Sequence, residues 1–402
     1  MEQWKQDRLI DILDTLIDYR GKTPNKVECG IPLITAKIVK NGRIETPTEF
    51  LTVEDYKDWM VRGYPQMGDV VITTEAPLGE VAQLRDDKIA LAQRIVCLRG
   101  KEGVLDNTYL KYFLMSNIGQ YRLKARETGT TVTGIKQSEL KEVLIDYPNY
   151  ELQQKIASIL SSFDSKIELN RRINDNLEQQ AQALFKSWFV DFEPFKDGEF
   201  VDSELGMIPK GWRVVCLGEV TKQVTEKVGN REDVTVLSPV NSGELVLSEE
   251  YFTKQVFSKN LSKYLIVNPL SFAYNPARIN IGSIGLNEYD FVGCVSPVYV
   301  VFKCEPNYHY FFDFYKRTAV FKDEVALRAI GGVRQSLGYD DFSLIKTIYP
   351  TPDVVAEFNN LYLKMKEVIT RNDIQNNKLT TLRDSLLPKL MSGELKINNF
   401  NR

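Results

Sequence analysis

The sequence carries the same long apolar stripe twice, once after Pro148 and once after Pro350, which lie 202 residues apart. In both segments the stripe residues alternate at spacings of three and four, the heptad pattern of a helix that packs along one seam. Two such helices most simply bury their stripes against each other as an antiparallel pair of about 36 residues, on the order of 50 Å long. The predicted seam positions are Ile156, Phe163, Asn170, Leu177, Leu184, Phe358, Met365, Asn372, Leu379 and Leu386.

Asn170 and Asn372 occupy the same position in the two stripes. An asparagine buried in such a seam fixes the register of the two helices at some cost in stability. We therefore expect both asparagines to set how the helices align, although two simply solvated side chains would give the same sequence.

The segments before the two stripes also repeat, more loosely. Trp4 and Leu9 have counterparts in Trp212 and Leu217, and the stretch 134–148 (GIKQSELKEVLIDYP) resembles 332–350 (GVRQSLGYDDFSLIKTIYP). Strand-like runs at 68–74 and 296–303 alternate with helical stretches such as 110–126. The sequence therefore predicts an α+β fold with two α+β domains separated by two long antiparallel helices, related as a pseudo-twofold circular repeat.

The expected boundaries follow from this pattern. They are a first α+β domain at 1–147, a spacer helix at 148–190, an acidic linker at 191–211, a second α+β domain at 212–349, a second spacer helix at 350–390 and a C-terminal tail at 391–402 that lies near the N-terminus.

Composition excludes several classes of protein. The chain has one histidine and five scattered cysteines, too few for a multi-histidine metal site and without the spacing of a zinc site or disulfide framework. No apolar run approaches ~18 residues, so we expect a cytoplasmic protein with no membrane span. The net charge is −3, but the linker stretch 191–204 alone carries −5, which leaves the remainder at +2.

The chain resembles the specificity subunit of type I restriction-modification enzymes. The resemblance rests on the helix endings LEQQAQALFKSWFVDFEPF and LRDSLLPKLMSGELKI and on GMIPKGW, which opens the second half. It implies a non-catalytic DNA-recognition subunit in which two target-recognition domains each recognise one half of a bipartite, asymmetric site in double-stranded DNA. It further implies that the helices fix the gap and dock two modification (methyltransferase) subunits, with restriction (translocase/endonuclease) subunits joining. The resemblance implies no cofactor for this subunit, and S-adenosylmethionine, ATP and Mg for the partner subunits.

Candidate DNA contacts follow from residue chemistry. Basic side chains and Gly-Thr-rich turns suit phosphate contacts, whereas arginine, lysine, asparagine and glutamine in loops suit base edges. The predicted phosphate contacts are Arg126, Thr130, Thr131, Lys136, Arg328, Arg334 and Gln335. The predicted base contacts are Lys37, Asn41, Gln93, Arg94, Asn275, Arg278 and Asn280. For each of these residues, a solvated surface side chain is the competing interpretation.

The predicted helix length sets a geometric expectation for the target. Recognition from one face of B-DNA favours half-site centres about one helical turn, ~10 base pairs, apart. Half-sites of three to five pairs would then leave a gap of about five to eight pairs.

Two other functions compete with this one. A self-contained DNA methyltransferase needs a glycine-rich cofactor turn and an Asn/Asp-Pro-Pro-aromatic motif, which the sequence lacks. A coiled-coil protein–protein adaptor without DNA binding would tolerate the acidic pI of 5.6 but has no need for duplicated basic loops. The acidic pairs Glu249-Glu250 and Asp340-Asp341 are more typical of solvated turns than of nuclease metal ligands.

Overall fold

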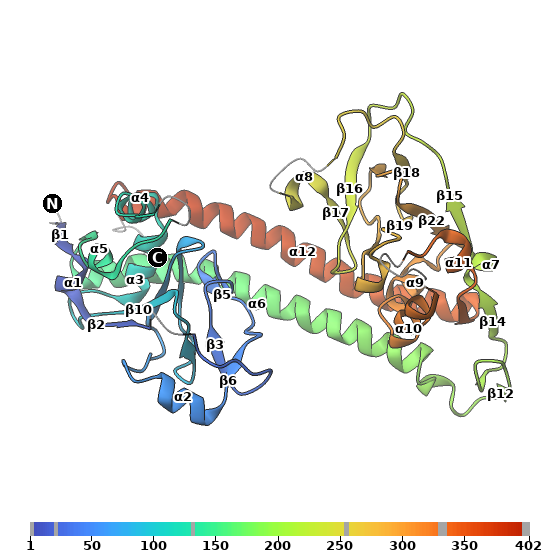
Figure 1. Ribbon diagram of the computed structural model, residues 1–402, viewed down its shortest axis with the longest axis horizontal. Coiled ribbons are helices and arrows are strands. Elements are labelled where there is room, and N and C mark those ends of the chain that lie inside the picture. Colours follow the sequence, from blue (N-terminus) through green and yellow to red (C-terminus); the bar gives the residue numbers. More distant parts are fainter. Residues whose placement is uncertain (1–3, 20–22, 130–132, 253–256, 329–335, 396–402) are drawn as a thin grey trace, which may run out of the picture. The chain divides into compact units, whose positions relative to one another are not determined.

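The structure is a computed structural model that describes residues 4–19, 23–129, 133–252, 257–328 and 336–395 (Figure 1). The chain forms two compact units. Unit 1 comprises Met1–Arg172 and Asn372–Arg402, and unit 2 comprises Ile173–Arg371. Each unit therefore combines one α+β portion with parts of both long helices.

The two long helices are α6 (Tyr150–Phe189) and α12 (Pro352–Met391), each of 40 residues. Both begin just after the repeated prolines, where a further helical turn cannot be added upstream. At the start of α6 the Asn149 side chain accepts a hydrogen bond from the backbone N–H of Leu152 at 2.9 Å, which caps the helix. The prediction of two long helices is confirmed.

The α+β portion of unit 1 contains eleven strands and five short helices within the described residues. In chain order they are β1 (Lys5–Arg8), α1 (Leu9–Ile12), β2 (Leu13–Asp18), β3 (Ile31–Ile34), β4 (Val39–Lys40), β5 (Arg43–Ile44), β6 (Phe50–Leu51), α2 (Val53–Trp59), β7 (Val70–Thr74), β8 (Leu78–Gln83), β9 (Ala90–Leu91), β10 (Ile95–Gly100), α3 (Asn107–Met115), α4 (Asn117–Lys124), α5 (Gln137–Lys141) and β11 (Leu144–Tyr147).

The principal sheet of unit 1 has the order β2-β10-β7-β8 and is antiparallel throughout. Its central strand β7 is buried on both faces: Val70 and Ile72 belong to the core that contains α3, and Val71 belongs to the core around the smaller sheet β6-β3-β9. Alternate residues of a strand point to opposite faces, so a continuously apolar strand fits between two cores. The helix end at Leu387–Met391 completes the first of these cores.

The α+β portion of unit 2 follows the same plan. In chain order its elements are the 3-10 turn η1 (Glu193–Phe195), β12 (Phe200–Val201), β13 (Ile208–Pro209), β14 (Arg213–Cys216), α7 (Leu217–Val220), β15 (Thr221–Val224), β16 (Thr235–Pro239), β17 (Leu245–Leu247), α8 (Ser248–Tyr251), β18 (Leu265–Val267), β19 (Phe272–Tyr274), the 3-10 turn η2 (Ile279–Ile281), β20 (Ile284–Leu286), β21 (Gly293–Val295), β22 (Val300–Cys304), α9 (His309–Tyr315), α10 (Ala319–Arg328), α11 (Tyr339–Ser343) and β23 (Lys346–Tyr349).

The sheets of unit 2 repeat those of unit 1. The order β15-β22-β19-β20 matches β2-β10-β7-β8, and β14 pairs with β23 as β1 pairs with β11. Even single hydrogen bonds recur: the N–H of Leu9 donates to the carbonyl of Val143, and that of Leu217 donates to the carbonyl of Ile345, both at 2.8 Å. The predicted α+β fold with an internal repeat is therefore confirmed, and the sheet order is a new finding.

The repeat differs in one respect from its first appearance in the sequence. The matched letters GIKQS and GVRQS are 198 residues apart, whereas α5 and α11, and β11 and β23, are offset by 202. The backbone hydrogen bonds agree with the longer offset. The N–H of Ile135 donates to the carbonyl of Thr74 at 2.9 Å, and the N–H of Leu337 donates to the carbonyl of Pro276 at 3.1 Å, so donor and acceptor are both offset by 202. Lys136 is thus equivalent to Gly338, and Arg334 lies outside the described residues.

The core of unit 2 is largely aromatic. On the long helices, Phe185 and Phe358 have ring centroids 5.8 Å apart, and Phe185 also lies 5.5 Å from Phe311 and from Phe314 of α9. The stretch Tyr308–Tyr315 therefore belongs to the core, and His309 is half-buried beside Tyr310.

The seam of unit 1 contains a polar contact between the long helices. The Asn170 side-chain N–H donates to Oε1 of Gln375 at 2.8 Å and to Oδ1 of Asn376 at 2.9 Å, and Asn170 is fully buried. Of the remaining predicted seam residues, Ile156, Phe358 and Asn372 are buried, and Phe163, Leu177, Leu184, Met365, Leu379 and Leu386 are partly buried.

The two ends of the described chain meet within unit 1. A Cβ on Gly393 would lie 3.0 Å from Nε1 of Trp4, and Trp4 packs on the same core as Leu390 and Met391. Residues 1–3 and 396–402 lie outside the described residues, so the expected position of the tail 391–402 near the N-terminus stays a prediction.

Candidate nucleic-acid interface

Three loops of unit 1 meet at one edge of the principal sheet. The turn after β7 holds Glu75, which forms a β-bridge with Gly134. Thr74 donates its N–H to the carbonyl of Arg94 at 3.0 Å and accepts a hydrogen bond from the N–H of Ile135. Gly134 is required here, because a Cβ at that position would lie 2.9 Å from the carbonyl oxygen of Thr74.

Several predicted contact residues of unit 1 gather at this edge. Arg94 is exposed but pairs with Glu75 at 2.8 Å, and Arg126 pairs with Glu139 at 3.0 Å. Lys136 is exposed at the residue before α5, Gln93 is partly buried, and Thr130 and Thr131 lie outside the described residues. The edge therefore offers a lysine and two arginines whose positive charge is partly compensated.

Lys37 and Asn41 lie apart from this edge, on and beside the β4–β5 hairpin. Asn41 is exposed and has φ 50°, a left-handed turn conformation that asparagine tolerates. Its backbone N–H donates to Oε2 of Glu80 on β8 at 2.7 Å, which ties the hairpin to the principal sheet. Lys37 is exposed just before β4.

The corresponding edge of unit 2 carries a longer loop, residues 275–283, between β19 and β20. Asn275 closes the loop, because its N–H donates to Ser283 at 3.0 Å and its side-chain oxygen accepts from the N–H of Ala277 at 3.1 Å. Arg278 and Asn280 are both exposed on this loop. The structure thus brings together the three residues predicted there.

Sequence reasoning missed Asn241 and Lys322, which lie beside this loop. A cavity of about 280 Å³ is lined by Asn241, Asn280, Ile281, Lys322 and the buried Lys316. Gly282 (φ +93°) makes the close approach possible, since a Cβ there would lie 2.8 Å from the carbonyl oxygen of Asn241. The Asn241-Ser242-Gly243 turn was visible in the sequence, but its proximity to the loop depends on the pairing of distant strands.

Other basic residues have structural partners. Arg328 pairs with Glu324 at 2.9 Å and donates to the carbonyl of Leu344 at 3.2 Å. Arg122 pairs with Asp146 at 2.7 Å and stacks over Phe113. Arg334 and Gln335 lie outside the described residues. The number of basic residues in a segment therefore overstates the positive charge that it presents.

The comparisons with known proteins agree with this architecture. Residues 1–179 match the family model described as "Type I restriction modification DNA specificity domain". A similar protein is the type I restriction enzyme MjaIX specificity subunit of Methanocaldococcus jannaschii, 29% identical over 99% of this chain and 95% of that protein. Residues 1–179 thus match the specificity domain of type I restriction-modification enzymes, and the whole chain is similar to specificity subunits of these enzymes.

Two further likenesses extend over most of this chain. The HindI specificity subunit of Haemophilus influenzae is 24% identical over 77% of the chain and 82% of that protein. The crystal structure of an S subunit from M. genitalium has a TM-score of 0.53 at 17% identity, covering 97% of this chain and 96% of that one, which supports the fold.

These similarities support a non-catalytic subunit. The methyltransferase and adaptor interpretations are accordingly not favoured. Among the described residues, no helix is long and apolar enough to cross a membrane, and no group of three or more histidine, cysteine, aspartate or glutamate side chains is arranged to hold a metal ion.

Proposed function

We propose that the chain recognises a bipartite, asymmetric site in double-stranded DNA, with each α+β portion contacting one half-site. The observation that carries this proposal is that the two units share one sheet order but differ in the loops at the same edge. Unit 1 has a short turn at Glu75, whereas unit 2 has the loop 275–283 with Arg278 and Asn280 exposed. A common scaffold with different loop side chains suits two readers of different sequences.

In this proposal the two recognition domains are residues 1–147 and 212–349. Spacer helices at 148–190 and 350–390, joined through the acidic linker 191–211 and followed by the tail 391–402, fix the gap and dock two methyltransferase subunits. A helix of 40 residues is about 60 Å long at 1.5 Å per residue, compatible with half-site centres about 10 base pairs apart and a gap of about five to eight pairs. Restriction subunits would join this complex in the cytoplasm, and the partner subunits would hold S-adenosylmethionine, ATP and Mg.

The predicted contact residues remain part of the proposal. Arg278 and Asn280 would contact base edges, whereas Lys136 would contact a phosphate, because Lys136 lies at the rim of the loop edge and offers a point charge. Arg94 and Arg126 would have to exchange or share their carboxylate partners to reach DNA.

The decisive test is a methylation map. The chain is co-expressed with a type I modification subunit, and methylated adenines are mapped across the host genome at single-base resolution. A bipartite motif with one fixed gap is expected. A stable complex that methylates no bipartite motif, or one contiguous motif, would contradict the proposal.

A further inference from the structure

One carboxylate of unit 1 joins the α+β portion to both long helices. Asp164 of α6 accepts hydrogen bonds at Oδ2 from Nζ of Lys111 and from the hydroxyl of Tyr112, both at 2.6 Å. Its Oδ1 accepts from Nη1 of Arg383 of α12 at 2.7 Å. We call these four residues the Asp164 junction. Since its donors come from α3 and α12, it connects three helices through one side chain.

The Asp164 junction is largely removed from solvent. The side chains of Lys111 and Arg383 are 8% and 10% exposed, and that of Asp164 is 18% exposed. Burial alone would raise the pKa of Asp164, but the contacts with Lys111, Tyr112 and Arg383 lower it. Hydrogen bonds between buried ions are strongly directional, so this junction favours one orientation of α3 over the two helices.

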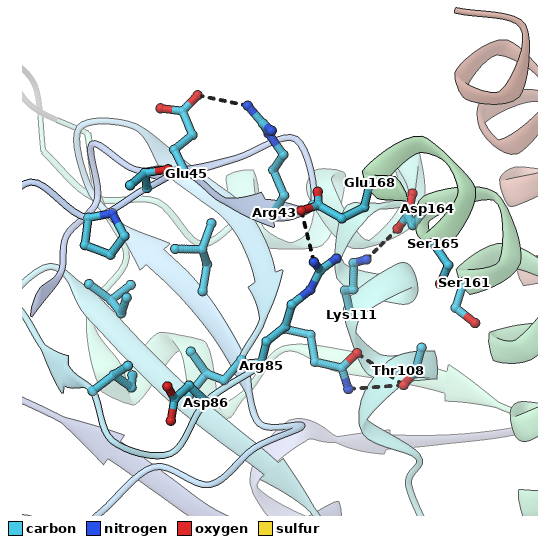
Figure 2. Close-up of a pocket in the computed structure, with 18 of the residues that line it drawn as sticks. Arg43, Glu45, Arg85, Asp86, Thr108, Lys111, Ser161, Asp164, Ser165 and Glu168 are labelled. Atoms are coloured by element: carbon cyan, nitrogen blue, oxygen red, sulfur yellow. Dashed lines mark hydrogen bonds and ion pairs between the residues drawn. The ribbon is translucent and has the colours of Figure 1, made fainter. Parts of the chain in front are cut away.

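A cavity separates the rest of the α+β portion from α6 beside this junction. It has a volume of about 450 Å³ and is lined on the α6 side by Ser161, Ser165 and Glu168 (Figure 2). Across it Arg85, just after β8, pairs with Glu168 at 3.2 Å. Close packing is interrupted here, so on this side of α6 the α+β portion is held by polar contacts, whereas Ile156, Ala157 and Leu160 pack into its apolar core.

In unit 2 the contacts between the α+β portion and the long helices differ chemically from those in unit 1. The residue equivalent to Asp164 is Lys366, whose ammonium lies 5.0 Å from the ring centroid of Tyr310 on α9 and pairs with Glu288, just after β20. The charge on the helix is thus reversed. Ala181 occupies the position equivalent to Arg383, and Phe185 and Phe358 pack directly against α9 through Phe314. The α+β portion of unit 2 is held mainly by close aromatic packing.

We propose that Asp164 is a positioning residue for DNA recognition: it fixes the orientation of the first recognition domain on α6 and α12, and thereby contributes to the length of the gap that the subunit accepts. The inference rests on the proposed function. It assigns the gap to two different contacts in addition to the length of the helices: in unit 1 an apolar core supplemented by the polar Asp164 junction, and in unit 2 aromatic packing.

The test uses the full chain assembled with modification subunits. Duplexes carrying the mapped half-sites are prepared with the natural gap and with gaps one base pair shorter and longer, and initial methylation rates are compared. Asp164→Asn keeps the size of the side chain but loses its charge. We expect the preference for the natural gap to fall about tenfold, since small misplacements of recognition groups cost up to about 10²-fold.

A second variant separates positioning from stability. Lys111→Met, Tyr112→Phe, Asp164→Leu and Arg383→Met together replace the buried ions by apolar groups, a change that often preserves stability. We expect this variant to unfold near the wild-type temperature yet to accept altered gaps. Lys366→Met is the matched control in unit 2, where the aromatic packing remains, and it should keep the natural gap preference.

The outcomes are distinct. A wild-type preference for the natural gap in both Asp164→Asn and the apolar variant would overturn the inference, as would an equal loss in Lys366→Met. If the apolar variant does not assemble, Asp164→Asn alone decides. The absence of any bipartite methylation by the wild-type complex would instead reject the proposed function itself.

Discussion

At the scale of single residues, the buried charged side chains of unit 2 depend on direct ion pairs and hydrogen bonds. Lys316 is 2% exposed at its side chain, and its ammonium contacts Oδ1 of Asp313 at 2.8 Å and the carbonyl of Ile284 at 3.0 Å. Asp313 also pairs with Arg317. A buried ion whose partner is removed is strongly destabilising, so these residues are coupled to the fold of unit 2.

Lys316→Met should therefore lower the free energy of unfolding of the chain by about 3 kcal/mol, because it leaves Asp313 buried with less compensation. The exposed Lys322, six residues further on, provides the control, and Lys322→Met should change that free energy by less than about 0.5 kcal/mol. Urea titrations of the three proteins measure both effects. Equal losses in the two variants would show that the burial of Lys316 is immaterial.

Asp313 also predicts an acid-sensitive contribution to stability. Its burial opposes ionisation, but Lys316 and Arg317 lower its pKa below the ordinary value. A carboxylate of this kind stabilises the fold above its unfolded pKa, about 3.9, and the contribution disappears as pH falls through the lower folded pKa. Asp313→Asn should consequently show a shallower loss of unfolding free energy below about pH 4 than wild type. Parallel curves from denaturation at several pH values would contradict this assignment.

Arg278 is the residue best placed for a base contact, since it is exposed on the loop 275–283. Arg278→Ala should relax the methylated motif at one position of one half-site and cost about 1–3 kcal/mol at the preferred base. Lys136→Ala, expected to remove a phosphate contact, should instead weaken DNA binding for all sequences and reduce the slope of log affinity against log salt by about one. Methylation maps and binding at several salt concentrations distinguish the two effects.

At the scale of single elements, the paired helices combine an apolar stripe with a buried polar contact. Asn170 donates to both Gln375 and Asn376 from a fully buried position. A polar residue in the seam destabilises misaligned helix pairs more than it stabilises the correct pair. We therefore expect Asn170 to set the register of α6 against α12.

Asn170→Leu should lower the free energy of unfolding by about 1–3 kcal/mol, because the Asn376 carboxamide stays buried without its donor. Adding Asn376→Leu removes the second polar group and should recover most of that loss. The double variant would keep its stability but would no longer fix the alignment of α6 and α12. The rate of disulfide formation between cysteines introduced on the two helices measures that alignment. An additive loss in the double variant would argue against a direct interaction.

The elements differ in how far the sequence predicts them. The heptad stripe predicts α6 and α12 as long helices, because a helical period sustained over about ten turns is compatible with little besides a long helix. The sheet order was not predictable, since β3 pairs in parallel with β9 across a long excursion of chain and neither strand is distinctive alone. For the contact residues, the sequence predicts only the type of side chain that suits DNA. Whether Arg122 or Arg126 is available to DNA depends on their ion pairs with Asp146 and Glu139, which the fold brings together.

At the scale of the whole molecule, the duplicated plan makes the two recognition functions separable. Replacing residues 1–147 by the corresponding segment of another specificity subunit should change one half of the methylated motif and leave the other half unchanged. The reciprocal exchange of 212–349 should change only the other half. A single exchange that alters both halves would show that the α+β portions do not act independently.

The contact between Trp4 and the end of α12 means that the order of the two domains along the chain can be exchanged. Because both ends of the described chain belong to one core, the chain could be opened in the exposed acidic linker near Asp197 and closed through its natural ends. Such a circular permutant would begin with the domain that now comes second. A complex of this permutant with modification subunits should methylate the same motif, because the orientation of the target on DNA depends on which protein surfaces contact the bases and not on the order of the domains in the chain.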